Sequence, residues 1–386
     1  MFLSLLQIGE TITVAGSLAA IGYYAACLWF ARSYLRTVPR TVKAGFGPPV
    51  SILKPLKGED PEIYQSFRSH CLQNYATYEL IFGVSDPADP AVRAVERLRR
   101  EFPQHPIQLI ICAQSLGTNA KVSNLAQMAR AASYDHFVVS DSDIRVSPHY
   151  LQHIMSPLAR PKVGVVTCLY RGIAGPTLGS KLESLGISTD FLGGVLVARS
   201  IEGGLRFALG STMAFRREDL QAMGGFESIV DYLADDYELG KRIADLEREV
   251  VLSDELVDTF LPPYTFRQFI DHQLRWARGV RAARPGGYFG LLFTFGWQWA
   301  LLGVLLSMGA WWSWGLLATA VILRGCVAWT VGWRVLRDAQ VVRLFPMLLL
   351  RDGIALFVWL ASFTSNVVTW RGDRFRVRAG KLVPVE

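Results

Sequence analysis

Paired acidic residues stand where an apolar stretch of the chain ends, and their spacing suits the binding of a metal ion. Asp141 and Asp143 follow the apolar residues HFVV. In extended backbone, residues two apart point to the same side, so both carboxylates can face one ligand. Carboxylates suit a hard divalent ion, Mg²⁺ or Mn²⁺, which also binds diphosphate oxygens. A polar turn at a strand end is the alternative, because the Asp-x-Asp pattern is common.

A second acidic pair, Asp235 and Asp236, lies in the segment YLADDYELG, where we predict the start of a helix. A carboxylate there can act as general base and take the proton from an attacking hydroxyl. The alternative is helix capping with a favourable interaction with the helix dipole. Both interpretations hold together if Asp235 caps the helix and Asp236 is catalytic.

Asp86 ends the segment FGVSD and is a candidate for nucleotide binding, because a carboxylate accepts a hydrogen bond from the N3–H of uracil. The alternative is a helix cap. Asp89 before Pro90, like Asp60 before Pro61, fits the cap-then-proline pattern better. Asp86 is therefore left without an evident structural role.

Basic and amide residues supply candidate contacts to a phosphorylated ligand. Lys54 ends the first apolar stretch, in KPLKG, which lacks the Gly-Lys-Ser/Thr of a P-loop and so argues against an ATPase. Asn119, Lys121 and Asn124 open a predicted helix, a favourable place for phosphate or ribose. For both groups, an ordinary solvated loop or helix end is the alternative.

The segment RQFIDHQLRWARGVRAAR, residues 267–284, is basic and amphipathic. A surface helix on anionic lipid is one interpretation. Arg275 and Trp276 suggest more, because arginine binds diphosphate bidentately and tryptophan can form a wall against an acceptor.

Strand-length apolar runs alternate with helical stretches between residues 46 and 264, which we interpret as one catalytic domain. The predicted strands are 50–56, 79–84, 107–112, 136–140 and 163–169, and the predicted helices 61–74, 90–102 and 119–132. This alternation predicts an α/β fold, a mostly parallel Rossmann-like sheet with helices on both faces. Such sheets bind ligands beyond the carboxyl ends of their strands.

Both ends of the chain predict membrane helices. The composition is 51% hydrophobic, and residues 11–31 are uncharged and long enough to span a bilayer. Arg32, Arg36, Arg40 and Lys43 follow this run, so residues 1–45 are expected to anchor the domain on the cytoplasmic side. The five scattered cysteines, without a CxxC pair, agree with a reducing compartment.

The C-terminal part divides into an amphipathic interfacial helix, residues 265–286, and membrane helices with a basic tail, residues 287–386. Three apolar runs, 288–308, 312–333 and 344–370, would leave the tail outside if all of them crossed. Arg351 and Asp352 interrupt the third run, so we expect that run to be re-entrant or interfacial. The net charge of +7 lies largely beside apolar runs, which favours lipid headgroups over nucleic acid.

The order of the motifs resembles that of a known family. KPLKGEDP, SDPADP, SDSDIR, GSTMAFRRE, LADDYE and LRW follow one another as in the ceramide glucosyltransferase-like family of GT-A glycosyltransferases. The resemblance covers residues 1–285 by motif and the whole chain by membrane layout. Within that family, the sequence is especially similar to the bacterial branch associated with hopanoid biosynthesis.

The resemblance implies an inverting, divalent-metal-dependent transferase in the bacterial inner membrane. Its donor would be a UDP-sugar carrying N-acetylglucosamine or glucose, and its acceptor a hopanoid such as bacteriohopanetetrol, or ceramide. It assigns nucleotide binding to Asp86, metal binding to Asp141 and Asp143, and base catalysis to Asp236. Arg275 and Trp276 match the end of the family's (Q/R)xxRW motif. His272 stands where that motif expects Gln or Arg.

Two other functions share parts of this pattern. A processive polysaccharide synthase has the same acidic residues and an Arg-Trp motif, although the C-terminal membrane part is small for a polymer channel. A membrane scaffold with a degenerate nucleotide-binding domain is the non-enzymatic alternative, and the intact acidic positions argue against it.

Overall fold

All five predicted strands lie in one sheet in a computed structural model, which describes residues 2–37, 46–370 and 372–385. The strand order is β3-β2-β1-β4-β7-β6-β8-β5. The bounds are Val50–Pro55 for β1, Tyr78–Val84 for β2, Ile107–Ile111 for β3, His136–Val139 for β4, Ile144–Arg145 for β5, Val163–Ile173 for β6, Met213–Arg216 for β7 and Glu249–Phe260 for β8. The predicted α/β fold class is confirmed.

The sheet is mixed rather than purely parallel. Strands β1 to β4, β6 and β8 share one direction, while β7 runs antiparallel between β4 and β6, and β5 antiparallel beside β8. The carboxyl ends of the parallel strands therefore meet at one edge. Strands β5, β7 and β8 were not predicted, because β5 and β7 are short and β8 carries several acidic residues.

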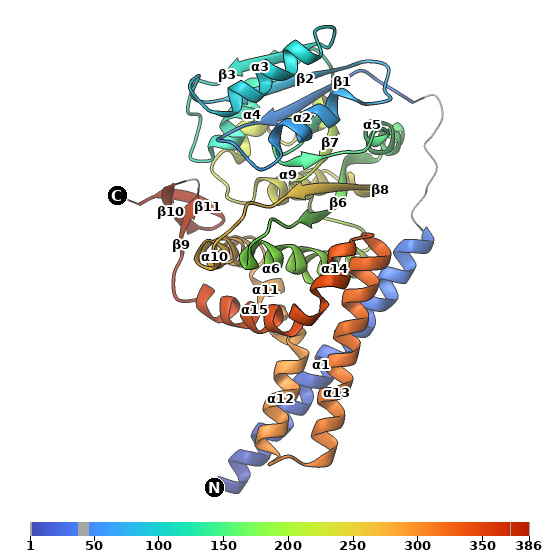
Figure 1. Cartoon of the computed structure of the whole chain (residues 1–386), viewed down its shortest axis with the longest axis vertical. Coiled ribbons are helices and arrows are strands. Elements are labelled where there is room, and N and C mark those ends of the chain that lie inside the picture. The colour runs from blue at the N-terminus through green and yellow to red at the C-terminus, as the bar shows by residue number, and fades with distance from the viewer. Residues whose placement is uncertain (1, 38–45, 371, 386) are drawn as a thin grey trace.

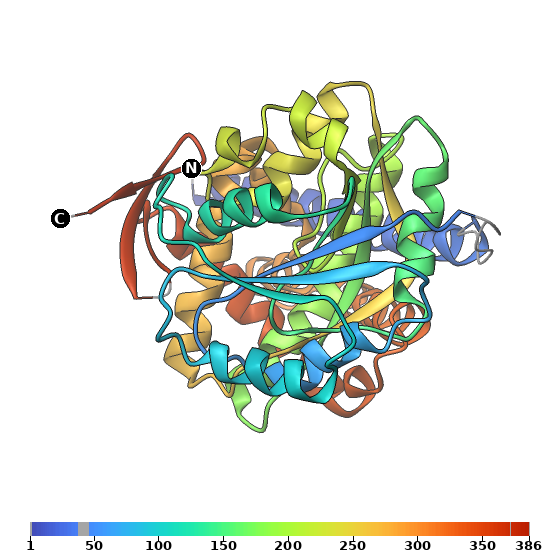
Figure 2. The same ribbon diagram turned by 90° about the horizontal axis from the view of Figure 1, so that it is seen from above.

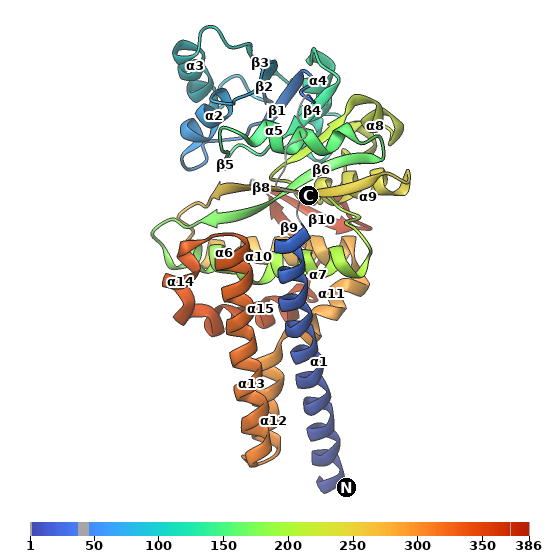
Figure 3. The same cartoon turned by 90° about the vertical axis from the view of Figure 1, so that its right-hand side faces the viewer.

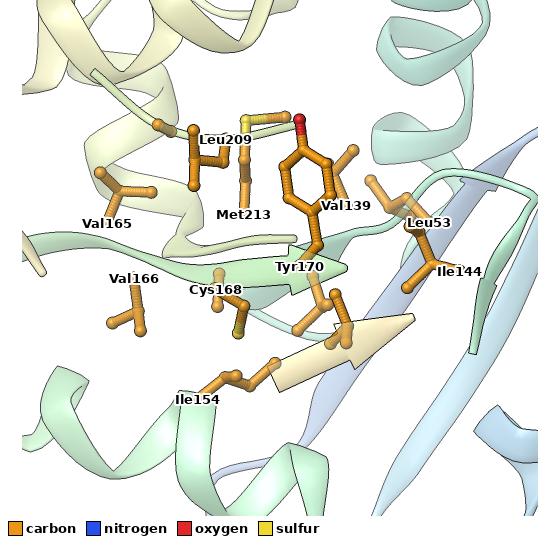
Figure 4. Close-up of a cluster of buried hydrophobic side chains, with 14 of the residues drawn as sticks. Leu53, Val139, Ile144, Ile154, Val165, Val166, Cys168, Tyr170, Leu209 and Met213 are labelled. Atoms are coloured by element: carbon orange, nitrogen blue, oxygen red, sulfur yellow. The ribbon is translucent and has the colours of Figure 1, made fainter. Parts of the chain in front are cut away.

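Helices cover both faces of the sheet, and apolar side chains fill the space between the layers. Helices α2 (Ile63–Cys71) and α3 (Ala91–Glu101) lie on one side and α4 (Ala120–Ala131) on the other (Figure 2). Figure 4 shows part of the core, where side chains of neighbouring strands such as Val139 and Met213 interdigitate. This packing fixes the strand ends that carry the candidate residues.

Three helices extend away from the sheet side by side (Figure 3): α1 (Phe2–Thr37), α12 (Gly296–Leu306) and α13 (Trp311–Ala328). Helix α11 (Pro285–Gly290) and the turn η4 (Leu291–Thr294) precede α12 and are bent from it by 54°. Within the described residues, three helical segments are long and apolar enough to cross a membrane, or four if the bent pair is one span.

The third C-terminal apolar run does not continue this bundle. Helix α15 (Leu348–Ser362) lies across the base of the α/β domain, against α10 (Phe266–Ala283) and α6 (Leu178–Gly186), as Figures 1 and 3 show. The segment 339–362, which includes the short α14 (Ala339–Leu344), is itself apolar enough to span. Its position brings the chain back to the side of the α/β domain.

The basic tail folds into an antiparallel sheet of β9 (Val367–Trp370), β10 (Asp373–Arg378) and β11 (Lys381–Pro384). This C-terminal sheet stands at one side of the α/β domain (Figure 1) and shares a buried apolar cluster with Leu233. No secondary structure was predicted for this tail. Its Arg371, like Arg40 and Lys43 of the N-terminal segment, lies outside the described residues.

Candidate active site

The end of β4 is fixed by a buried lysine of the neighbouring strand. The Lys54 ammonium donates to Ser140 Oγ at 3.1 Å and to the carbonyl oxygen of Asp141 at 2.7 Å. Burial lowers the pKa of Lys54 to about 7, although Asp141 and Asp143 oppose the shift. Lys54 is fully buried, so in this structure it lies beneath Asp141 and supports it.

Lys121 joins the two acidic sites that the sequence analysis singled out. Its ammonium lies 2.8 Å from Asp141 Oδ1 and 3.1 Å from Asp235 Oδ2. Burial by itself lowers the pKa of Lys121, but the two carboxylates outweigh it, so the pKa is raised and the lysine stays charged. This ion triad brings the end of β4 and the start of α9 (Asp235–Asp245) together.

Asp236 is held in the first turn of α9 by two backbone N–H groups. Oδ2 accepts from Gly210 N and Oδ1 from Tyr237 N, both at 2.8 Å. A Cβ on Gly210 would stand 3.1 Å from Asp236 Oδ2 and 3.5 Å from Asp141 Oδ2, so both carboxylates face this glycine. Burial and the charge of Asp235 raise the pKa of Asp236, although Lys121 opposes them.

Asp143 is tied to β8 on the other side of the same turn. Its Oδ2 accepts from Thr259 Oγ1 at 2.5 Å, and its carbonyl oxygen accepts from Phe260 N at 3.3 Å. Burial, with the added charge of Asp141, raises the pKa of Asp143 to about 6. Two carboxylates of like charge are thus held close together.

The donor chemistry of this pair fits a divalent cation. The described residues contain no group of three or more His, Cys, Asp and Glu side chains that could hold a metal by themselves. Mg²⁺, however, is usually bound by one or two carboxylates, with waters and substrate phosphates as the other ligands. Asp141 and Asp143 would supply the protein's share of such a site.

Asp86 lies at a strand end that β1 separates from β4 in the sheet. It follows β2, is exposed, and accepts a hydrogen bond from Ala88 N at 2.8 Å, so it does have a local structural role in a turn. Asn124 is buried and accepts from Ser85 Oγ at 2.9 Å, which fixes the residue before Asp86. Nucleotide binding by these residues stays a prediction.

The start of α4 is anchored on the loop that precedes the acidic pair of α9. Asn119 caps α4 by accepting from Val122 N at 3.2 Å, and its Nδ2 donates to Tyr232 O at 2.7 Å. Since Lys121 is two residues further on, this contact sets its position relative to Asp235.

Helix α10 places its aromatic and basic residues beside the domain. The Trp276 ring packs against Phe191 at a centroid distance of 5.6 Å and against His272 at 5.5 Å. Arg275 lies over the Trp370 ring, 6.0 Å from its centroid. Trp276 is thus packed between two other rings, and its role as a wall against an acceptor stays a prediction, while Arg275 reaches the C-terminal sheet.

Glu183 is a residue that the sequence analysis missed. It is buried in α6, with Oε1 3.1 Å from His272 Nδ1 and Oε2 accepting from Gln273 Nε2 at 2.9 Å. Burial raises the pKa of a carboxyl, but His272 and Gln273 outweigh it and lower the pKa of Glu183. The only sign of Glu183 in the sequence was a single acid in the mainly apolar stretch LGSKLESLG. Glu183 is the hydrogen-bond partner of the histidine that stands in the motif.

Comparison with solved structures identifies the fold class of the α/β domain. Mannosyltransferase PcManGT from Pyrobaculum calidifontis, solved in complex with GDP-Man and Mn2+, superposes with a TM-score of 0.54 at 20% sequence identity. The match covers 90% of this chain and 99% of that chain. The α/β domain therefore has the GT-A fold of nucleotide-sugar glycosyltransferases.

The family follows from the sequence match. The model of glycosyl transferase family 21 matches residues 12–383, and the chain belongs to this family. Ceramide glucosyltransferase 3 of Caenorhabditis elegans is 24% identical over 348 residues, which are 87% of this chain and 74% of that protein. Ceramide glucosyltransferase 1 of the same organism is 25% identical over 239 residues, 62% and 51% of the two chains.

Proposed function

We propose that this chain transfers one sugar from a UDP-sugar to a hydroxyl of a membrane lipid, with inversion, at the cytoplasmic face of a bacterial inner membrane. The observation that carries this proposal is a series of neighbouring side chains that leads from the surroundings of Asp236 to α15. Burial and then the charge of Asp236 raise the pKa of Tyr170, whose ring lies 6.0 Å from Phe191. Phe191 contacts Trp276 and directly follows Asp190, which pairs with Arg351 of α15.

The geometry favours Asp236 over Asp235 as the general base. The carboxylate of Asp235 is paired with the Lys121 ammonium, which lies 3.1 Å from Oδ2 and so competes with a substrate proton for this oxygen. Asp236 accepts only backbone N–H groups in the described contacts, and these fix its orientation while leaving lone pairs for a substrate proton. Taking the proton of an acceptor hydroxyl as it attacks the anomeric carbon is the step we assign to Asp236.

Asp141 and Asp143 would hold a divalent cation, Mn²⁺ or Mg²⁺, and Lys121 and Lys54 keep Asp141 in place. When bound, such an ion neutralises the charge that develops on the departing nucleotide diphosphate. Arg275 would add a cationic contact to the diphosphate, and Asp86 would receive the uracil ring. Trp276 would border the acceptor.

The names of the similar proteins support a lipid acceptor and a nucleotide-sugar donor. Two relatives are called ceramide glucosyltransferases, and the solved neighbour contains GDP-Man and Mn2+. For this chain we propose N-acetylglucosamine or glucose as the sugar, and a hopanoid such as bacteriohopanetetrol, or ceramide, as the acceptor. Arg32 and Arg36 at the end of α1 support the cytoplasmic placement of the domain.

A product assay tests the proposal. Purified protein in lipid nanodiscs receives Mn²⁺, UDP-N-acetylglucosamine, UDP-glucose or GDP-mannose, and bacteriohopanetetrol or ceramide, with products identified by mass spectrometry. One sugar added to one lipid, lost on chelation with EDTA, is the expected result. A polymeric product would instead support the processive synthase, and transfer to neither lipid would reject the proposed acceptors.

A further inference from the structure

A cavity lies where the membrane bundle meets the α/β domain, and polar side chains line it. Helices α1, α12, α13 and α15 and the π-helical turn η2 (Ile187–Phe191) contribute to its wall. The polar lining residues are Tyr23, Tyr24, Thr189, Asp190, Thr294, Gln298, Arg324, Arg351 and Asp352. Placing charged side chains within membrane helices is costly in free energy, and where such residues occur they usually mark a binding site or a substrate path.

The charges around the cavity are balanced. Arg324 forms a bidentate pair with Asp352, at 2.7 and 2.8 Å, and donates to the carbonyl and hydroxyl oxygens of Thr189 at 3.1 and 3.2 Å. Arg351 Nη1 lies 2.6 Å from Asp190 Oδ2. Two cations and two anions cancel, so the cavity suits an uncharged ligand rather than an anion or a metal ion.

Hydrogen-bond acceptors remain available beside these pairs. Gln298 Nε2 donates to the Asp352 carbonyl oxygen at 2.9 Å, while its Oε1 is buried without a hydrogen-bond partner in the part of the chain that the structure describes. Asp190 keeps 41% of its side chain exposed despite its ion pair. A buried acceptor without a donor is costly, and a ligand hydroxyl would satisfy it.

The backbone is interrupted beside the same cavity. The 54° bend between η4 and α12 lies at Thr294–Gly296, and Tyr24 bridges it: its hydroxyl donates to Thr294 O at 2.8 Å and accepts from Gly296 N at 3.1 Å. Broken helices at membrane depth are tolerated where protein buries them or where they line a cavity. In transporters such breaks commonly accompany substrate sites.

We propose that this cavity is the binding site for the polar head of the lipid acceptor, an uncharged head with several hydroxyl groups. The inference rests on the proposed function and adds to it the place where the acceptor is held. A head bound against Gln298 and Asp190 lies next to Phe191, and Phe191 contacts Tyr170 and Trp276 beside the catalytic centre. The cavity volume of about 20 Å³ holds roughly one water molecule, so binding requires it to widen, and the bend at Thr294–Gly296 is the place for that movement.

The test uses Gln298→Leu in the full-length protein in nanodiscs, with Ser307→Ala as the matched control. Ser307 follows α12 and bonds with Ser313, and it does not line the cavity. The probes are bacteriohopanetetrol and ceramide, and the readouts are the KM for lipid, the KM for donor, and hydrolysis of the donor to free sugar. Gln298→Leu should raise the KM for the lipid that the wild-type protein glycosylates about fivefold or more, with the KM for donor and the rate of donor hydrolysis unchanged. Ser307→Ala should change none of the three.

An unchanged lipid KM in Gln298→Leu, in a wild-type background that does glycosylate lipid, overturns the cavity proposal and leaves the proposed function standing. Transfer to neither lipid by the wild type removes the basis of both. If Gln298→Leu does not fold, Ala355→Leu carries the test, because it adds volume at the cavity wall without removing a polar contact. It should raise the lipid KM in the same way, and an unchanged value again overturns the proposal.

Discussion

At the residue scale, the site is defined by which carboxylates have a cation as partner and which do not. Lys121 pairs with both Asp141 and Asp235, while the neighbouring Asp236 is oriented by Gly210 N and Tyr237 N. We therefore propose different roles for chemically identical side chains, set by their surroundings. Substitutions at two of the acids should separate those roles.

Asp236→Asn should lower kcat by about 10²–10⁴-fold, because the amide cannot take the acceptor proton, and should leave donor affinity nearly unchanged. Asp143→Ala should weaken donor binding that depends on Mn²⁺. Isothermal titration with UDP-sugar, with and without Mn²⁺, and steady-state kinetics measure the two effects. A comparable loss of donor affinity in both variants would contradict separate roles.

The pH profile of the wild-type protein reports on the same base. Burial and the charge of Asp235 raise the pKa of Asp236 to about 6, and only the deprotonated carboxylate can accept a proton. We expect kcat/KM, measured at saturating Mn²⁺, to be level above that pH and to fall about tenfold per pH unit below it. A profile that stays level down to about pH 4, the range of an ordinary aspartate, would exclude a buried base.

At the element scale, the C-terminal sheet positions the loop that carries the acidic pair. Leu382 N donates to Asp231 O at 2.7 Å, and Leu233 N donates to Gly380 O at 3.0 Å. The Leu233 side chain is buried with Val377 in the cluster between this sheet and α10. Since Leu233 is two residues before Asp235, the sheet and the turn that carries Asp235 and Asp236 form one packed unit.

Val377→Asp should therefore lower kcat about tenfold or more, because a charge in this cluster displaces the loop and misplaces Asp236. Val383→Asp is the matched control, since Val383 lies in the same sheet with 40% of its surface exposed. Kinetics and thermal unfolding in nanodiscs measure both variants. Equal activity of the two would show that the C-terminal sheet does not position the catalytic turn.

At the scale of the whole molecule, the arrangement of helices sets the topology in the membrane. Helices α1, α12 and α13 run side by side away from the α/β domain, and α15 lies across its base (Figure 3). We expect three crossings, by α1, by α12 with the segment before it, and by α13, which would place the N-terminus and the turn between α12 and α13 on the side opposite the domain. The C-terminal sheet then lies on the side of the domain, where the positive-inside rule expects its arginines.

Cysteine labelling of intact cells tests this topology in a Cys326→Ser background, which removes the exposed native thiol. Met308→Cys, at a site that is 90% exposed in the turn after α12, should react with an impermeant maleimide from outside. Glu218→Cys, on the surface of the α/β domain, should react only after the membrane is permeabilised. The reverse pattern would place the catalytic domain outside.

The sequence by itself determined the features that depend on local pattern. Apolar runs with helical stretches between them predicted β1 to β4 and β6. Because Asp141 and Asp143 follow β4, they were expected at the edge of the sheet formed by the carboxyl ends of the strands. Apolar runs of sufficient length predicted α1 and α13. Residue type and neighbourhood along the chain were enough for these features, because hydrophobic periodicity and hydropathy are set within a short window.

Only the tertiary structure decided which distant groups meet. The position of Lys121 between Asp141 and Asp235, the partnership of Glu183 with His272, and the C-terminal sheet against Leu233 all join segments far apart in the chain. Arg351 and Asp352 looked only like an interruption of an apolar run. The tertiary structure pairs Arg351 with Asp190 and Asp352 with Arg324. A buried charge needs a counter-charge close in space, and that partner can lie far away in the sequence.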